Sequence, residues 1–235
     1  MSKLLASSDL LEAATYALVG ARCRRTHLHD LRGDLQALNS SVELLVRAAK
    51  AAGENTPLAE KAGALARKTL LSHEKTMVEL IELSAPGDEA ATPVDVGELI
   101  GEVTSFLRND ALRSSVAVRV KAAAGVSIVT HRRLCKTIFV GLCAMTIDAM
   151  PEGGCIDITV GRSESLASIE LKAGTPLPPI PDAFELGACG PAAYSPFELL
   201  AMLARRWILE SGGRLDLPQE SQGLCALRFS YPLSK

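Results

Sequence analysis

The chain has 235 residues, enough for one large domain or two small ones with hydrophobic cores. Apolar residues make up 48% of it, which excludes an intrinsically disordered protein, and a net charge of −2 gives no reason to expect nucleic-acid binding. No apolar run approaches the ~20 residues that span a membrane, and the N-terminus lacks a secretory signal, so we expect a cytoplasmic protein without a membrane partner.

The six cysteines are scattered, and no two have CxxC spacing. This distribution is typical of reduced, mostly buried thiols, and it predicts neither disulfides nor a zinc site. We therefore expect no resident metal.

The first predicted element is a long helix over residues 8–52, followed by a turn and a second helix over residues 58–84. A heptad pattern runs along the first helix through Leu28, Leu31, Leu35, Leu38, Val42 and Leu45. The pattern on the second is less regular and passes through Leu65, Thr69, Ser72, Thr76, Leu80 and Leu83. Two long helices with a short connection form an antiparallel hairpin. One hairpin cannot bury both sides of such helices, so we predict a homodimer through residues 8–84.

A polar, proline-bounded linker over residues 85–93 separates the hairpin from a second domain of different composition. We therefore place the domains at residues 1–86 and 87–235. In the second domain the sequence predicts about three helices on a mixed sheet of about five strands, an α+β arrangement. The expected helices cover residues 95–110, 131–149 and 195–210, and the expected strands cover residues 116–124, 155–162, 166–174, 214–220 and 223–233.

Histidines 27 and 29 lie at the beginning of the first heptad pattern, on either side of Leu28. With Leu28 at position a, His29 falls on the solvent side and His27 on the flank. An exposed imidazole followed by a carboxylate, Asp30, on a rigid helix suits reversible phosphorylation at nitrogen. An ordinary surface histidine is the alternative. The remaining three histidines (His27, His73 and His131) are interpreted as structural or incidental.

Two arginines and a glycine flank His29 at helical spacing. Arg25 lies one turn before it and Arg32 nearly one turn after it, where they could bind phosphoryl oxygens. Gly33 is either a tolerated exposed glycine or a gap that lets a partner approach His29 closely.

This arrangement resembles the catalytic core of bacterial sensor histidine kinases over roughly residues 15–235. Residues 29–32, His-Asp-Leu-Arg, resemble the phosphoacceptor segment of that family, and residues 148–154, DAMPEGG, are the most specific match in the second domain. The resemblance implies a dimeric four-helix bundle followed by a histidine-kinase-type α/β sandwich. It also implies His29 as the phosphorylated residue, with Asp30 and Arg32 assisting it.

The second domain departs from that family at three places that bind ATP and Mg2+. Thr146 stands where the family has a metal-binding asparagine. Residues 171–176 lack the aspartate that recognises adenine. Residues 192–200 lack the glycines that let the backbone approach phosphate, and they include Pro196 and Glu198. We therefore expect a degenerate ATPase-like domain that binds no ATP or other cofactor.

These observations favour a histidine phosphotransferase of a bacterial phosphorelay rather than an active ATP-dependent kinase. It would accept a phosphoryl group on His29 from a receiver-domain aspartate and pass it to a response regulator, with Mg2+ bound to the receiver. The alternative is a non-catalytic pseudokinase scaffold that binds or sequesters a response regulator. A kinase with an unusual nucleotide site is a third interpretation, and phosphatase action is disfavoured because Gly33 has no side chain to place a water.

Overall fold

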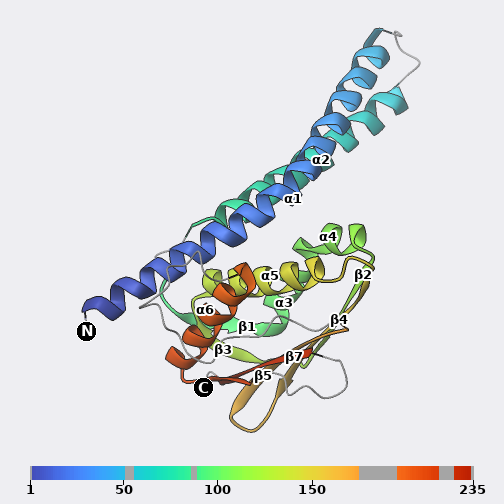
Figure 1. Cartoon of the computed structure of the whole chain (residues 1–235). Helices are drawn as coiled ribbons and strands as arrows, with labels where there is room; N and C mark the ends of the chain where they lie inside the picture. The colour runs from blue at the N-terminus through green and yellow to red at the C-terminus, as the bar shows by residue number, and fades with distance from the viewer. Residues whose placement is uncertain (1, 51–55, 86–88, 175–194, 217–224, 234–235) are drawn as a thin grey trace. The chain divides into compact units, whose positions relative to one another are not determined.

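The structure, a computed structural model, describes residues 2–50, 56–85, 89–174, 195–216 and 225–233 (Figure 1). The chain divides into two compact units. The hairpin unit comprises Gly20–Ser84, and the sandwich unit comprises Met1–Val19 together with Ala85–Lys235. The first 19 residues thus group with the sandwich, although they belong to the same helix as the start of the hairpin. No helix within the described residues is long and apolar enough to cross a membrane.

The hairpin consists of two helices, α1 (Ser2–Lys50) and α2 (Thr56–Glu82). Helix α1 begins six residues earlier than predicted, while the other boundaries agree within two residues. The base of the hairpin is close-packed because Gly20 has no side chain: a Cβ atom there would lie 2.9 Å from Ser84 Oγ. Arg24 Nη1 also donates a hydrogen bond to Ser84 Oγ, at 3.0 Å.

The two helices pack through a different stripe from the one the sequence predicts. On the part of α1 that carries the predicted pattern, the buried positions are His27, Ser41 and Ala48, whereas Leu28, Leu35 and Val42 are exposed. On α2, Thr69, Leu80 and Leu83 are buried as expected, but Leu65 and Ser72 are exposed. Small residues such as Ala48 and Ala62 are buried between the helices, while Leu28, Leu35 and Leu65 are exposed.

A mixed five-stranded sheet forms the base of the sandwich unit. Its strand order is β2-β4-β5-β7-β6, in which β2 and β4 are parallel and the other neighbours are antiparallel. The bounds are β2 Val116–Ala122, β4 Gly154–Arg162, β5 Leu166–Ala173, β6 Arg214–Asp216 and β7 Cys225–Pro232. The alternation of apolar and polar residues correctly predicted these strands and the β4–β5 hairpin.

Among the described residues after the hairpin, the sandwich has the helices α3 (Val96–Phe106), α4 (Arg108–Arg113), α5 (Arg132–Asp148) and α6 (Pro196–Glu210). The single helix predicted over residues 95–110 is wrong. Asp95 caps α3 by accepting a hydrogen bond from the Glu98 N–H at 2.9 Å, and the helix is interrupted at Leu107. A separate two-stranded sheet, β1 (Thr92–Asp95) with β3 (Ser127–Thr130), occupies part of the expected linker and was not predicted.

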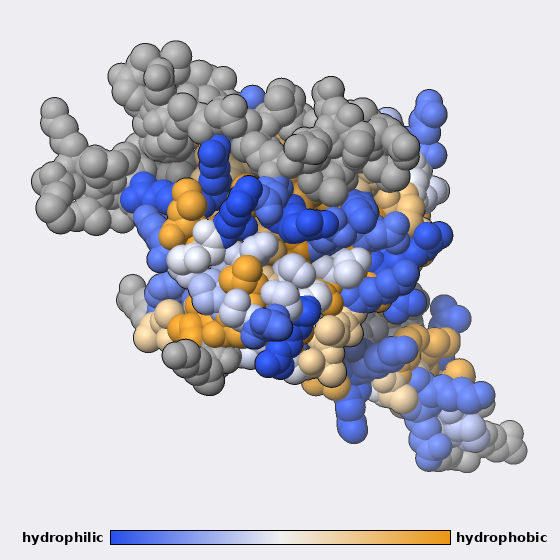
Figure 2. Space-filling model, turned by 90° about the horizontal axis from the view of Figure 1, so that it is seen from below, coloured by the Kyte–Doolittle hydropathy of each residue, from blue (hydrophilic) through white to orange (hydrophobic). Residues whose placement is uncertain are grey.

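Helices α3, α5 and α6 lie on one face of the sheet (Figure 1) and enclose the core. Phe139 of α5 meets Phe229 of β7 edge to face, with ring centroids 5.3 Å apart. The opposite face carries charged pairs, including Glu170 with Arg228 at 2.8 Å and Glu170 with Lys172 at 3.0 Å. Figure 2, seen from below, shows mainly hydrophilic residues with scattered apolar ones over the described surface.

Candidate phosphoacceptor segment and candidate nucleotide site

The predicted phosphoacceptor His29 belongs to α1, within the hairpin unit. Its backbone is helical, but its side chain lies outside the described residues, so the exposure of its imidazole stays a prediction. A long uninterrupted helix provides the rigid support that in-line attack on phosphorus requires.

Its neighbour His27 is 4% exposed, so the prediction that His27 lies on the flank is wrong. His27 and Ser41 are buried, whereas Leu28 and Val42, one position later and expected in the core, are exposed. Burial makes His27 a poor acceptor for a phosphoryl group delivered by another protein, and it agrees with a structural role.

Asp30 and Arg32 differ in their surroundings. Asp30 Oδ2 lies 3.7 Å from His27 Nδ1, and the Asp30 side chain is 21% exposed. Arg32 is exposed, as is Arg25 on the preceding turn. The carboxylate expected to assist His29 is thus also a neighbour of His27, while both guanidinium groups are accessible to an incoming anion.

Thr146, at the position of the metal-binding asparagine, is fully buried in α5. Its hydroxyl donates a hydrogen bond to the Leu142 carbonyl within the same helix, at 2.7 Å. This side chain therefore does not reach beyond its own helix and is not placed to hold a metal ion.

The start of α6 is closed by its own side chains. Ser195 Oγ accepts from the Glu198 N–H at 3.3 Å, and Glu198 Oε2 accepts from the Ser195 N–H at 2.6 Å, which is a capping box. The hydrogen bonds from Ser195 lower the pKa of Glu198 and favour its ionised form. Pro196 removes another donor from the first turn. An ionised carboxylate therefore lies at the N-terminus of α6, where it disfavours a bound anion.

The hydroxyl of Thr146 and the carboxylate of Glu198 are therefore both engaged in hydrogen bonds within their own helices or caps. Residues 192–194 of the expected phosphate-binding segment lie outside the described residues, as do residues 175 and 176 of the segment that lacks the adenine-binding aspartate. Lys172, within the segment without an adenine-binding aspartate, pairs with Glu170 at 3.0 Å. Elsewhere in the described part of the chain, no three His, Cys, Asp or Glu side chains are grouped as metal ligands.

Comparison with known proteins gives no match to a protein-family model or to a curated protein sequence. Solved structures do match. The nucleotide-free catalytic domain of the histidine kinase ThkA is 22% identical, with a TM-score of 0.50, over 62% of this chain and 97% of that chain. A histidine kinase from Burkholderia phymatum is 16% identical, with a TM-score of 0.49, over 95% of this chain and 97% of that chain.

A structure described as a bacterial phosphotransferase is 17% identical, with a TM-score of 0.47, over 92% of this chain and 95% of that chain. The likeness to the ThkA domain concerns the fold. The predicted fold class is confirmed: this chain is an α+β protein with an N-terminal helical hairpin and an α/β sandwich like that of histidine kinase catalytic domains.

Proposed function

We propose that this protein is a histidine phosphotransferase of a two-component phosphorelay and that it works without ATP. The proposal rests on two features found together in this chain. A phosphoacceptor-like segment, residues 29–32, lies on a helical hairpin, while the kinase-like sandwich has Thr146 and Glu198 engaged where nucleotide would be held. The energy for phosphorylating His29 then comes from the acyl phosphate of a receiver domain.

In this reaction a nitrogen lone pair of neutral His29 attacks the phosphorus of the receiver's aspartyl phosphate. A P–N bond forms, the P–O bond to the receiver breaks, and its carboxylate leaves with the electron pair. Asp30 orients the imidazole or accepts its proton, and Arg25 and Arg32 stabilise the phosphoryl oxygens. The reverse sequence on a second receiver passes the group to a response regulator, with Mg2+ bound by the receiver in both steps.

The homodimer is part of this proposal and rests on one side of the hairpin. On each helix an exposed apolar residue directly follows one that faces the other helix: Leu28 follows His27, and Ile81 follows Leu80. Because the helices are antiparallel and each position turns about 100°, these exposed residues lie on the same side. This apolar side consists of Leu28, Leu35, Val42 and Val46 of α1 with Leu70, Met77 and Ile81 of α2. A second copy would bury it in a four-helix bundle.

A phosphotransfer assay with site-specific variants tests the function. Receiver domains loaded with acetyl phosphate are incubated with the protein, and acid-labile phosphate is mapped by mass spectrometry. We expect phosphate at residue 29, its loss in His29→Ala, and its retention in the control variants His27→Gln and His73→Gln. If His29→Ala still accepts phosphate, or if wild-type protein binds receivers without accepting any, the transferase is excluded; the second result favours a pseudokinase scaffold.

The absence of ATP binding is tested separately by calorimetry with ATP and Mg2+. We expect no heat of binding because Glu198 repels phosphate at the start of α6. Saturable binding would contradict the ATP-free mechanism and would favour a kinase with an unusual nucleotide site.

A further inference from the structure

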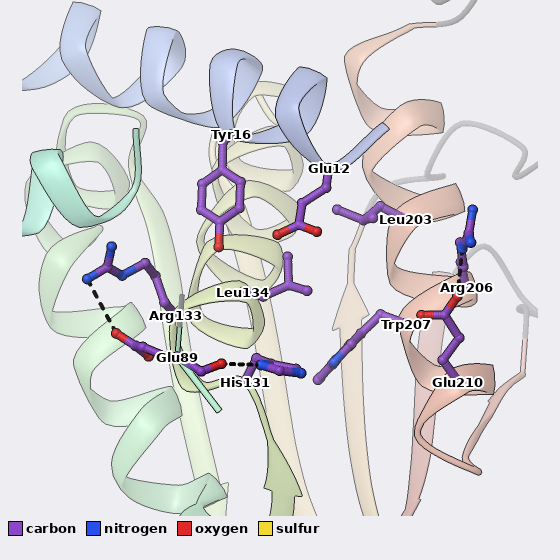
Figure 3. A pocket seen from close by; sticks show the side chains of 10 residues that line it. All are labelled: Glu12, Tyr16, Glu89, His131, Arg133, Leu134, Leu203, Arg206, Trp207 and Glu210. Carbon is purple, nitrogen blue, oxygen red and sulfur yellow. Dashed lines mark hydrogen bonds and ion pairs between the residues drawn. The ribbon is translucent and has the colours of Figure 1, made fainter. Parts of the chain in front are cut away.

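A cavity of about 260 Å³ lies within the sandwich unit, away from the degenerate nucleotide positions. Figure 3 shows it between the first part of α1, the start of α5 and the second half of α6. His131 and Leu134 contribute from the start of α5, whereas Thr146 lies near the other end of that helix. The cavity is thus separate from the site that resembles the kinase family.

Trp207 of α6 places an unsatisfied donor at this cavity. The residue is 4% exposed, and its ring packs against that of Tyr231 with the ring centroids 5.1 Å apart. Its Nε1 has no hydrogen-bond partner among the described residues. Figure 3 shows the indole pointing from α6 into the cavity, toward His131. An indole N–H can only donate, and leaving it buried without an acceptor is unfavourable. The missing acceptor can be supplied by a ligand.

Carboxylates outnumber cations around the cavity. Three glutamates and two arginines line it, and each arginine is paired: Arg133 with Glu89 at 3.3 Å, and Arg206 with Glu210 at 2.8 Å. Glu12, the third glutamate, points from α1 into the cavity (Figure 3). The lining therefore presents more carboxylates than guanidinium groups, which disfavours an anionic ligand and favours a cationic one.

Tyr16 supplies the wall next to Glu12 and is buried, with its hydroxyl hydrogen-bonded to the Thr137 side chain. Burial, together with the charge of Glu12, raises the pKa of Tyr16 to about 12, so this wall stays neutral. An ionised carboxylate accepts about four hydrogen bonds, and Glu12 can therefore bind a ligand cation in addition to its contacts within the protein.

We propose that this cavity binds a small ligand with an ammonium or guanidinium group beside Glu12 and a hydrogen-bond acceptor beside the Trp207 indole N–H. A free basic amino acid has this chemistry. The cavity volume of about 260 Å³ lies just below that of typical ligand pockets, roughly 300–1,000 Å³, which suits a molecule as small as an amino acid. The proposal is independent of phosphotransfer at His29.

Trp207 is the sole tryptophan of the chain, so its indole N–H gives one assignable resonance. The experiment titrates L-arginine, L-lysine and L-citrulline separately into the 15N-labelled full-length protein and follows that resonance. We expect L-arginine or L-lysine to shift it with saturation below ~10 mM, which is weaker than most specific binding. L-citrulline, which matches L-arginine in shape but has no side-chain charge, should bind at least about 10-fold more weakly.

Two variants test the predicted contacts. Glu12→Gln should weaken the binding of the cationic ligand about 10-fold or more, because a charge-assisted hydrogen bond is lost. The control variant Glu164→Gln changes an exposed residue in the β4–β5 turn and should not affect binding. Trp207→Phe keeps an aromatic ring against Tyr231 but removes the donor, and calorimetry should show weaker binding while thermal unfolding confirms that the variant is folded.

Three results would overturn the proposal. The indole resonance stays unchanged with both L-arginine and L-lysine; L-citrulline binds as well as L-arginine; or a folded Glu12→Gln protein retains full affinity. None of these results bears on whether His29 accepts phosphate.

Discussion

At the scale of single residues, Asp30 is the side chain with two possible tasks. It follows His29 in sequence, yet its carboxylate lies 3.7 Å from His27. An aspartate on a helix reaches residues three positions away more readily than its direct neighbour. The same carboxylate can therefore hold His27 in place and assist a reaction at His29.

Substitution of Asp30 separates these tasks. We expect Asp30→Asn to slow phosphoryl transfer to His29 by about 100-fold, because the amide cannot accept the imidazole proton, and Asp30→Glu to restore much of the rate. The measurement is the single-turnover rate with a phosphorylated receiver, alongside the thermal unfolding temperature. An unchanged rate with a lowered unfolding temperature would assign Asp30 to the support of His27 alone.

At the scale of the elements, two glycines of α1 have opposite environments. A Cβ atom at Gly33 would meet no atom within 4 Å, whereas one at Gly20 would lie 2.9 Å from Ser84 Oγ and 3.2 Å from the Leu83 carbonyl oxygen. Gly20 is thus needed for the close approach of the two helices, and Gly33 is not needed for the packing of the hairpin.

The two alanine variants should therefore change stability in opposite directions. Gly33→Ala should raise the free energy of unfolding by about 1 kcal/mol, from helix propensity, and Gly20→Ala should lower it by roughly 1–3 kcal/mol, from overpacking. Urea unfolding followed by circular dichroism measures both. A Gly33→Ala protein that is more stable but accepts phosphate more slowly would show that Gly33 provides clearance for the receiver. Equal effects of the two substitutions would contradict the described helix contacts.

Local sequence patterns predict the longer strands of this protein but not its short strands or the interruption between α3 and α4. The strands of the main sheet were predicted because alternation over seven to nine residues is a clear local signal. β1 and β3 have four residues each and are held by pairing between Thr92–Asp95 and Ser127–Thr130, which no local pattern reveals. The helix expected at residues 95–110 begins as predicted, with the cap at Asp95, but it is interrupted at Leu107, which the apolar pattern of this segment does not reveal.

At the scale of the whole molecule, the apolar side of the hairpin determines the expected assembly. Leu35 and Leu71 are both exposed, at 56% and 61%, but only Leu35 belongs to that side, while Leu71 lies on the outer face of α2. This pair of leucines separates the loss of a specific interface from a general change in surface hydrophobicity.

A single charge on the apolar side should dissociate the dimer. We expect Leu35→Glu to weaken dimerisation by about two orders of magnitude or more, because burying an unpaired carboxylate costs several kcal/mol, and Leu71→Glu to leave it intact. Sedimentation velocity over a range of concentrations measures the association. A monomeric wild-type protein, or dissociation by Leu71→Glu alone, would contradict the proposed bundle.

The sequence by itself determined the properties that are local: the two long helices, the main strands, the change of composition near residue 85, and the residues 29–32 that resemble a phosphoacceptor segment. Hydrophobic periodicity reports which positions avoid water, and it does so without knowledge of their partners. Only the tertiary structure decided the partners. In the structure His27 is buried and Leu28 is exposed. The heptad pattern could not predict this, because it does not distinguish the side of α1 that faces α2 from the side available to a second copy. It also brought Glu12 and Trp207 to one cavity, because packing joins residues from distant parts of the chain that no local pattern connects.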